Sequence, residues 1–336
     1  LWQSVLDTFQ NSTIHDLEQH YSTFTGGTFR PIFWSIVALL STAIVSWMGV
    51  QSGIERISKL LMPLLLIILL LLIGHAFMMP GCDQGMRFLF KPDFSKLTPQ
   101  VMLNAMGQCF FSLSIAMGIL ITYGAYMPKG QDIISTTLQV TSLDTIVAIL
   151  AGVAIFPAVF AMGVEPTEGP KLVFVILPTV FSQMPLGQFW AILFFLLITL
   201  AAVTSLLALL EGTISFVSER WNIKRNKAIA IIIVLLIIAL TLCSLSLTGK
   251  IQALQPFGIS LFDLLDFITS KILMPIGALG ILSYVGWFSP REATEDELRK
   301  HSKLQFKLFY HVYFFLIRYL LPIVILLIFL NGLGVL

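Results

Sequence analysis

The sequence consists of long apolar runs separated by short polar breaks. A run of about 17 to 25 mainly apolar residues is long enough to cross the hydrocarbon core of a bilayer as an α-helix. The pattern predicts eight such helices, near residues 32–50, 57–79, 100–127, 134–163, 187–217, 227–248, 259–288 and 308–334. We therefore expect an all-α polytopic membrane protein, with the lipid bilayer as its solvent.

Composition supports this fold class and excludes others. Of the 336 residues, 57% are hydrophobic and 11% charged, which is far more apolar than a soluble domain. The net charge of +2 and the lack of a long basic cluster argue against nucleic acid as a partner. Cys82, Cys109 and Cys243 are scattered, so their spacing indicates neither a disulfide framework nor a zinc site. We interpret residues 1–336 as one transmembrane domain.

Loop charges predict the orientation of the helices. Lys and Arg gather in the connections at 51–59, 128–133, 219–227 and 289–307, and the positive-inside rule places these loops in the cytoplasm. Both ends of the chain then lie outside. The loop 165–184 on that outer side contains Pro166, Gly169, Pro170 and Pro178, which predicts a re-entering, lid-like segment.

Polar residues inside the third predicted helix form one face. Asn104, Gln108 and Ser112 recur every fourth residue, and the small residues from Ala116 to Gly118 follow at a point where a helix can open. An opened helix is tolerated at membrane depth where protein or a water-filled cavity satisfies the freed backbone groups. A polar seam that joins two helices is the alternative interpretation of this face.

The fourth predicted helix carries a carboxylate, Asp144, near its middle. A carboxylate at this depth requires a proton, a basic partner or a bound cation, and the helix contains neither Lys nor Arg. A proton or a metal ion is therefore favoured, and a protonated, hydrogen-bonded structural Asp remains the alternative.

The fifth predicted helix carries hydroxyls at its centre, in the run from Ala201 to Thr204 and Ser205. Hydroxyl and carbonyl oxygens suit an alkali cation and not a zinc or copper ion. The alternative is that the hydroxyls bond back to the preceding turn of their own helix. For Glu211, Lys271 and Arg318, the other deep charges, we expect structural pairing.

Several segments resemble the neurotransmitter:sodium symporters, a family with the LeuT fold. The runs 107–114 (GQCFFSLS) and 122–126 (TYGAY) resemble that family's sixth helix. The segments 169–178, 201–205 and 318–322 resemble its fourth outer loop, eighth helix and eleventh helix, in the correct order. The resemblance spans the chain, is closest to bacterial amino-acid transporters, and implies helices four to eleven of about eleven in an inverted-repeat fold.

The resemblance also implies roles for individual residues. Substrate contacts would come from Phe111, Ser112, Ser114, Met117, Ser205 and Leu209. Ligands of a first sodium ion would be Ser112 and Asp144, and ligands of a second would be Ala201, Thr204 and Ser205. Asp266 would be an outer gate and Glu219 an inner one. Ala116 departs from the family, in which glycine is frequent at this position, and Lys271 receives no role.

The family resemblance implies sodium-coupled symport of neutral, mostly hydrophobic L-amino acids in a bacterial cytoplasmic membrane. Two sodium ions are expected and chloride is not, because Asp144 supplies the negative charge that chloride supplies in animal relatives. The sequence begins at Leu1 without a Met, so we expect an upstream part to be missing, and the resemblance implies that this part holds the first three helices.

Two other classes compete with this interpretation. An uncoupled channel or an amino-acid receptor would use a similar polar seam. A membrane-embedded enzyme would need a nucleophile with a base or a metal cluster, and the five His residues form no convincing pair within a span. We therefore do not expect an enzyme.

Overall fold

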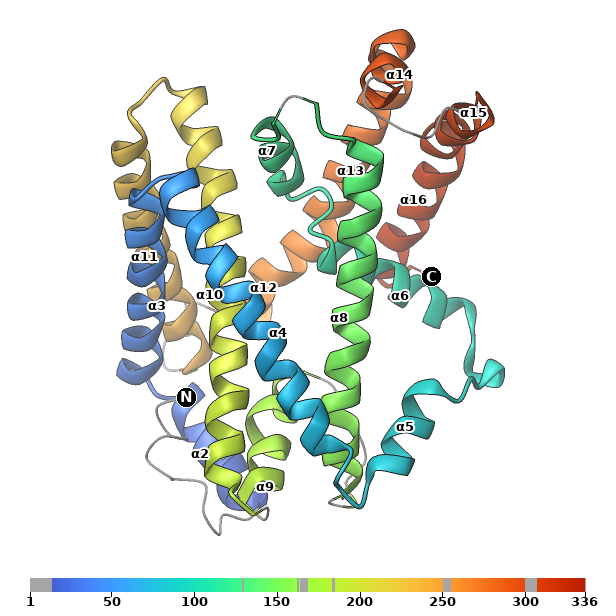
Figure 1. Cartoon of the computed structure of the whole chain (residues 1–336). Coiled ribbons are helices and arrows are strands. Elements are labelled where there is room, and N and C mark those ends of the chain that lie inside the picture. Colours follow the sequence, from blue (N-terminus) through green and yellow to red (C-terminus); the bar gives the residue numbers. More distant parts are fainter. Residues whose placement is uncertain are drawn as a thin grey trace. The chain divides into compact units, whose positions relative to one another are not determined.

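The structure is a computed structural model that describes residues 14–128, 130–161, 163, 169–182, 185–249, 255–299 and 307–335. These residues form helices and their connections, and no strand occurs among them. The α-helices, shown in Figure 1, are α2 (Ile14–Thr25), α3 (Phe29–Trp47), α4 (Arg56–Ala76), α5 (Cys82–Phe90), α6 (Pro99–Ser112), α7 (Ile119–Ala125), α8 (Ile133–Ala161), α9 (Leu177–Ser182), α10 (Gly187–Arg220), α11 (Arg225–Leu247), α12 (Leu261–Asp266), α13 (Met274–Ser283), α14 (Arg291–Arg299), α15 (Lys307–Phe315) and α16 (Leu321–Gly332).

In the part of the chain that the structure describes, five π-helical segments interrupt or extend these helices, at Val50–Glu55, Leu172–Ile176, Phe267–Leu273, Tyr284–Phe288 and Leu316–Leu320. A π-helical turn is wider than an α-helical one, and such turns are frequent at functional positions. The hydrophobic pattern gave no sign of these segments, because one extra residue in a turn barely changes the periodicity of a fully apolar run.

Seven helices in the described part of the chain are long and apolar enough to cross a membrane. They are Phe29–Trp47, Gly53–Ala76, Ile133–Ala161, Gly187–Arg220, Arg225–Leu247, Leu261–Phe288 and Tyr310–Gly332. These correspond to seven of the eight predicted spans. The eighth, predicted at 100–127 as one helix, is instead the pair α6 and α7, because residues 113–118 leave the helical conformation.

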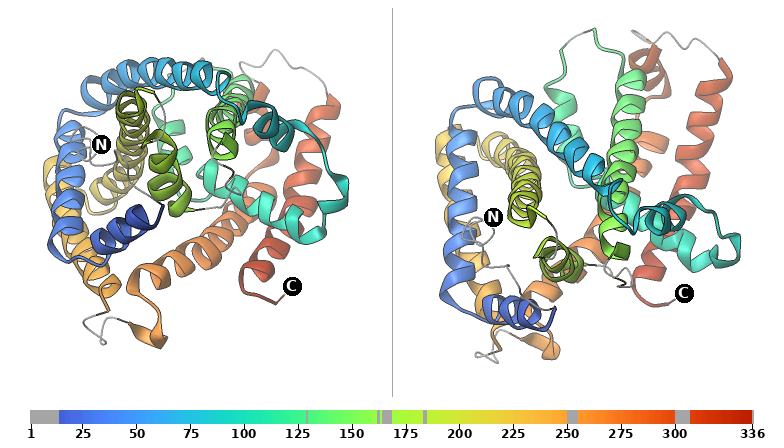
Figure 2. Two further views of the ribbon diagram at one scale, coloured as in Figure 1. Left: turned by 90° about the horizontal axis from the view of Figure 1, so that it is seen from below. Right: turned by 60° about the horizontal axis from the view of Figure 1, so that its bottom comes forward.

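The chain divides into two compact units, residues 1–92 with 147–261 and residues 93–146 with 262–336. Helix α8 begins in the second unit and ends in the first. In the first unit, α3 packs beside α11, and both contact α10, while α4 crosses α10 (Figures 1 and 2). Apolar side chains fill this junction, including Leu39, Ala43, Ile214 and Ile229.

A second core in the first unit surrounds the part of the predicted outer loop that the structure describes. The π-helical segment Leu172–Ile176 and α9 pack on α10 and α2, with Val175, Leu177 and Phe194 buried. Lys171 also lies 3.7 Å from Glu18 of α2. The predicted lid is therefore helical where it is described; residues 164–168 and 183–184, including Pro166, lie outside the described part.

The second unit contains α6, α7, the first half of α8, and the helices from α13 to α16. Helix α16 packs on α13 and on α6, and the π-helical segment Leu316–Leu320 contacts the segment Tyr284–Phe288. The guanidinium groups of Arg291 and Arg318 lie 4.7 Å and 5.8 Å from the centre of the buried Phe314 ring of α15. These contacts attach the charged helix α14 to the membrane-spanning part.

Candidate functional site

The helix break between α6 and α7 is the main irregularity of the second unit. Ser114, Ala116 and Gly118 have φ of 53°, 68° and 77°, in the left-handed region. That region is accessible to glycine and strained for serine and alanine. The expected opening is therefore present. Ala116 adopts the left-handed conformation in spite of its Cβ, so it increases the strain at the break.

Ser112, the last residue of α6, faces Asp144 of α8. The Ser112 hydroxyl lies 3.0 Å from Oδ1 of Asp144 and 2.9 Å from Oδ2, and it donates its proton to this carboxylate. Two residues that the sequence analysis assigned to one ion therefore lie within hydrogen-bonding distance. A hydroxyl and a carboxylate together offer three hard oxygens, which is the donor type that a small alkali cation requires.

The other expected substrate contacts of this unit lie at or beside the break. Phe111 is 54% exposed, so its ring is available to a ligand. Ser114 and Met117 are half-buried within the break itself. The structure thus gathers Phe111, Ser112, Ser114 and Met117 on one short stretch of chain, which combines an aromatic ring, two hydroxyls and a thioether.

The first unit holds the second expected set on α10. The Thr204 hydroxyl donates to the Ala201 carbonyl at 2.9 Å, which brings two of the expected ligands together and is also the back-bonding that we gave as the alternative. Thr204 and Ala201 are half-buried, while Ser205 and Leu209 are exposed on the same stretch of helix. Ligation of a sodium ion by these oxygens stays a prediction.

The two expected gate residues lie at the surface of their respective units. Asp266 ends α12, is exposed, and accepts a hydrogen bond of 3.0 Å from Ser270 Oγ. Glu219 is exposed in the last turn of α10. Their roles as outer and inner gates stay predictions.

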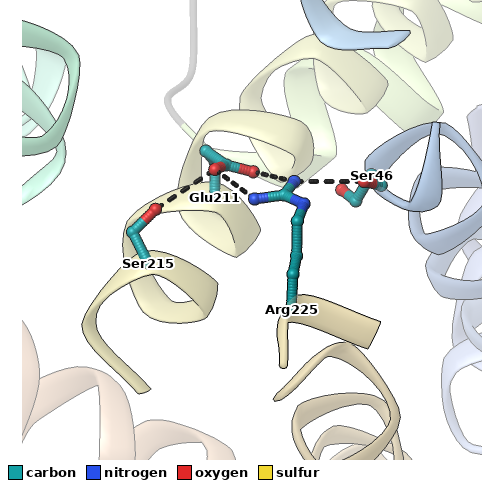
Figure 3. Close-up of polar contacts among 4 residues, drawn as sticks. All are labelled: Ser46, Glu211, Ser215 and Arg225. Atoms are coloured by element: carbon teal, nitrogen blue, oxygen red, sulfur yellow. Dashed lines mark hydrogen bonds and ion pairs between the residues drawn. The ribbon is translucent and has the colours of Figure 1, made fainter. Parts of the chain in front are cut away.

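Of the three deep charges expected to pair, Glu211 does so with Arg225 at 2.6 Å (Figure 3). Arg318 donates through Nε to the carbonyl of Gly286, in the π-helical segment Tyr284–Phe288. The aliphatic part of Lys271 lies against Gly332. We therefore assign Lys271 no chemistry.

An amide network between α6 and α16 was not predicted. Gln100 Nε2 donates to Asn331 Oδ1, and Asn331 Nδ2 donates to Asn104 Oδ1 at 3.1 Å. The regular spacing of Asn104 and Gln108 indicated a polar face, but no sequence signal connects that face with a single Asn more than 220 residues away. This network partly supports the polar-seam interpretation of α6.

No group of three or more His, Cys, Asp or Glu side chains that could hold a metal ion occurs among the described residues. The expected sodium ligands are of another kind, namely hydroxyls, a carbonyl and one carboxylate. The chemistry of this donor set fits an alkali cation.

Seven apolar helices among the described residues, a helix break within a predicted span and hard-oxygen donors beside that break are typical of a multi-pass membrane protein of the transporter class. A family model supports this class, because that of the sodium:neurotransmitter symporter family matches residues 5–335. The chain belongs to this family, whose members are transporters and not enzymes.

Known proteins similar to the chain agree with this family. The sodium-dependent transporter YhdH of Bacillus subtilis is 36% identical over 301 residues, which cover 90% of this chain and 66% of YhdH. A sodium-dependent transporter of Haemophilus influenzae is 37% identical over 315 residues, covering 91% and 66%. The chain thus spans about two thirds of the length of these relatives.

Among solved structures, that of MhsT in complex with L-phenylalanine resembles the fold with a TM-score of 0.85 and 34% identity. The similarity covers 98% of this chain and 74% of the MhsT chain. The chain therefore has the LeuT fold that its sequence motifs implied.

Proposed function

We propose that the protein is a sodium-coupled symporter of neutral, mostly hydrophobic L-amino acids that works by alternating access. The observation that carries this proposal is the contact of Ser112 with Asp144 at the end of α6, next to the helix break. A carboxylate and a hydroxyl at an opened helix can bind a cation and a polar ligand in one place. The family and the names of the sodium-dependent relatives support the choice of ion.

We assign two sodium sites. The first uses Ser112 and Asp144, and the second uses Ala201, Thr204 and Ser205 of α10. If sodium stabilises the same conformation as the amino acid, each ligand raises the affinity of the other by the same factor. Chloride is not required, because Asp144 already provides a fixed negative charge next to the first sodium ion.

The proposed substrate class follows from the residue types at the break and on α10. Phe111, Met117 and Leu209 offer apolar surface, and the thioether of Met117 adapts to side chains of different shapes. The six proposed contact residues carry no formal charge that would pair with a lysine or glutamate side chain. The similarity to an MhsT structure that contains L-phenylalanine supports the same class.

The proposed location is the cytoplasmic membrane of a bacterium, since the sodium-dependent relatives described above come from bacteria. Asp266 and Glu219 are proposed as the outer and inner gate acids of the transport pathway. We also propose that the two units act as one transport domain.

Uptake into liposomes tests the proposal. The product of the complete gene is reconstituted, and labelled leucine, methionine or phenylalanine is supplied with an inward sodium gradient. We expect accumulation above the outside concentration, which collapses when sodium is equal on both sides. Uptake that only equilibrates would indicate an uncoupled channel, and binding without uptake would indicate a receptor. Competition by lysine or glutamate, with none by leucine, would contradict the substrate class.

A further inference from the structure

An amide clasp joins the first two turns of α6 to the last turn of α16, within the second unit. We use this name for the side chains of Gln100, Asn104 and Asn331. Asn331 lies at its centre, because its Oδ1 accepts a hydrogen bond from Gln100 Nε2 and its Nδ2 donates to Asn104 Oδ1 at 3.1 Å. One amide thus uses its acceptor and a donor on two successive turns of the same helix. This arrangement fixes where α6 lies along α16.

The backbone holds both sides of the clasp in place. The Val101 N–H donates to Thr98 Oγ1 at 3.3 Å, which caps the start of α6. Helix α16 ends at a glycine cap: Gly334 has φ of 73°, and its N–H donates to the backbone carbonyl of Asn331 at 3.0 Å. The clasp therefore connects two capped helix ends, and Asn331 is not part of a frayed terminus.

Close packing continues the contact between the two helices below the clasp. A Cβ on Gly107 of α6 would lie 3.7 Å from the side chain of Ile328 of α16, in ordinary van der Waals contact. Gly107 follows Asn104 by three residues, whereas Ile328 precedes Asn331 by three, so the two helices run in opposite directions. The contact thus extends over one further turn of each helix, and it combines hydrogen bonds with apolar packing.

The side of α6 that carries the clasp leads to the proposed site. Successive residues of an α-helix are about 100° apart, so Phe111 lies on the same side of α6 as Gln100 and Asn104. Ser112 follows about 100° further round the helix, and its hydroxyl donates to Asp144 of α8. A rotation of α6 about its axis would therefore displace the Phe111 ring and the Ser112 hydroxyl together.

We propose that Asn331 is a positioning residue for transport, because the amide clasp sets the rotation of α6 and so presents Ser112 to the first sodium ion and Phe111 to the substrate. The first part of this inference, that the clasp fixes α6, is independent of the proposed function, and the second part rests on it. A seam that only joins two helices would affect the amount of folded protein. A clasp that orients α6 also affects the affinity for sodium.

Hydrogen–deuterium exchange of the full-length protein in nanodiscs tests the first part. Asn331→Leu keeps the branched shape of the side chain and removes both its donor and its acceptor, and Asn104→Leu removes one acceptor. We expect exchange in residues 99–112 to rise at least threefold in both variants, with unchanged exchange in α10. Gln139→Leu is the matched control, because Gln139 Nε2 bonds to Ser135 Oγ within its own helix, at 3.3 Å. Wild-type exchange of α6 in both variants would overturn the clasp.

Sodium-driven uptake into liposomes tests the second part. Hydrogen bonds between membrane helices are individually modest, so we expect Asn331→Leu to raise the sodium KM about fivefold. Its maximal rate per folded protein should stay within twofold of the wild type. Asn104→Asp keeps the acceptor for Asn331 Nδ2, so its sodium KM should stay within twofold of the wild type. The double variant Asn104→Leu with Asn331→Leu should be no more impaired than Asn331→Leu alone, since residues in contact do not act additively.

Three results would overturn the positioning role. They are a wild-type sodium KM in Asn331→Leu, a sodium KM of Asn104→Asp as high as that of Asn104→Leu, and effects of the two Leu substitutions that multiply in the double variant. Absence of sodium-driven uptake by the wild type would contradict the proposed function, and the exchange of α6 would still decide whether the clasp fixes this helix.

Discussion

At the scale of single residues, the most informative contact is that of the Ser112 hydroxyl with both carboxylate oxygens of Asp144. The sequence allowed each residue to be recognised, because a carboxylate or a regular polar face within an apolar span is costly. It could not show that the two side chains meet, since they lie 32 residues apart on different helices. Their contact supports the first sodium site that the family resemblance implied for these two residues.

Replacement of Asp144 by Asn tests this site. The variant keeps the shape but removes the charge that favours a cation in a poorly solvated place. We expect the sodium affinity to fall at least tenfold, or by about 1.4 kcal/mol. Sodium-dependent uptake at a series of sodium concentrations measures this change. The wild type should transport when gluconate replaces chloride.

A second substitution adds a control for the charge argument. Ala148 lies one turn after Asp144 in α8 and has no hydroxyl for an anion. With Ala148→Ser present, chloride should partly restore the sodium dependence of Asp144→Asn. If wild-type uptake needs chloride, or if Asp144→Asn keeps normal sodium dependence, Asp144 is the protonated structural residue of the alternative interpretation.

The hydroxyls of α10 can be tested together. Thr204→Val with Ser205→Ala removes two hard-oxygen donors and little volume, so a sodium ion at this site would lose ligands. We expect the sodium KM to rise at least tenfold while the protein still folds. Thr199→Val, which removes a hydroxyl bonded to its own helix at the Phe195 carbonyl, is the control. Equal sodium KM values in both variants would favour the back-bonding interpretation.

At the scale of helices, the break at residues 113–118 shows how far pattern reasoning extends. The small residues after Ser112 indicated where the helix opens, but the hydrophobic pattern alone predicted one continuous span. Helical periodicity is set by side chains, whereas the break is set by backbone angles at Ser114, Ala116 and Gly118. The π-helical segments escaped prediction for the same reason.

The strain at Ala116 leads to a prediction about stability. A β-branched residue is a severe outlier at φ of 68°, so Ala116→Val should destabilise the protein by about 1 to 3 kcal/mol. Ala116→Gly should not, because glycine adopts this conformation freely. Thermal unfolding in detergent compares these variants with Ala105→Val on the exposed side of α6. A Tm for Ala116→Val equal to that of the Ala105 control would contradict the strain.

At the scale of the whole molecule, the chain divides into two compact units, and their operation as one transmembrane domain stays a prediction. Apolar spans look alike in sequence whether they contact lipid or another helix, since lipid tails are as apolar as leucine. Which helices pack against one another therefore depends on specific polar contacts, such as the Glu211–Arg225 pair between α10 and α11. Seven of the eight predicted spans and the family could be predicted, while the break in the remaining span and the grouping of helices could not.

The fixed carboxylate of Asp144 also has an electrical consequence. If, as proposed, two sodium ions move with one zwitterionic amino acid, and if the negative charge near the first sodium ion belongs to the protein and not to a co-transported anion, two net charges move inward. Each charge gains about 2.3 kcal/mol per 100 mV of membrane potential, so two gain about 4.6 kcal/mol. A potassium diffusion potential set by valinomycin, negative inside, should therefore accelerate uptake into liposomes at equal sodium on both sides. Uptake that is insensitive to this voltage would mean that a compensating ion moves in each cycle. In that case transport would be electroneutral in spite of the charge of Asp144, and the wild-type current, measured on solid-supported membranes, would vanish.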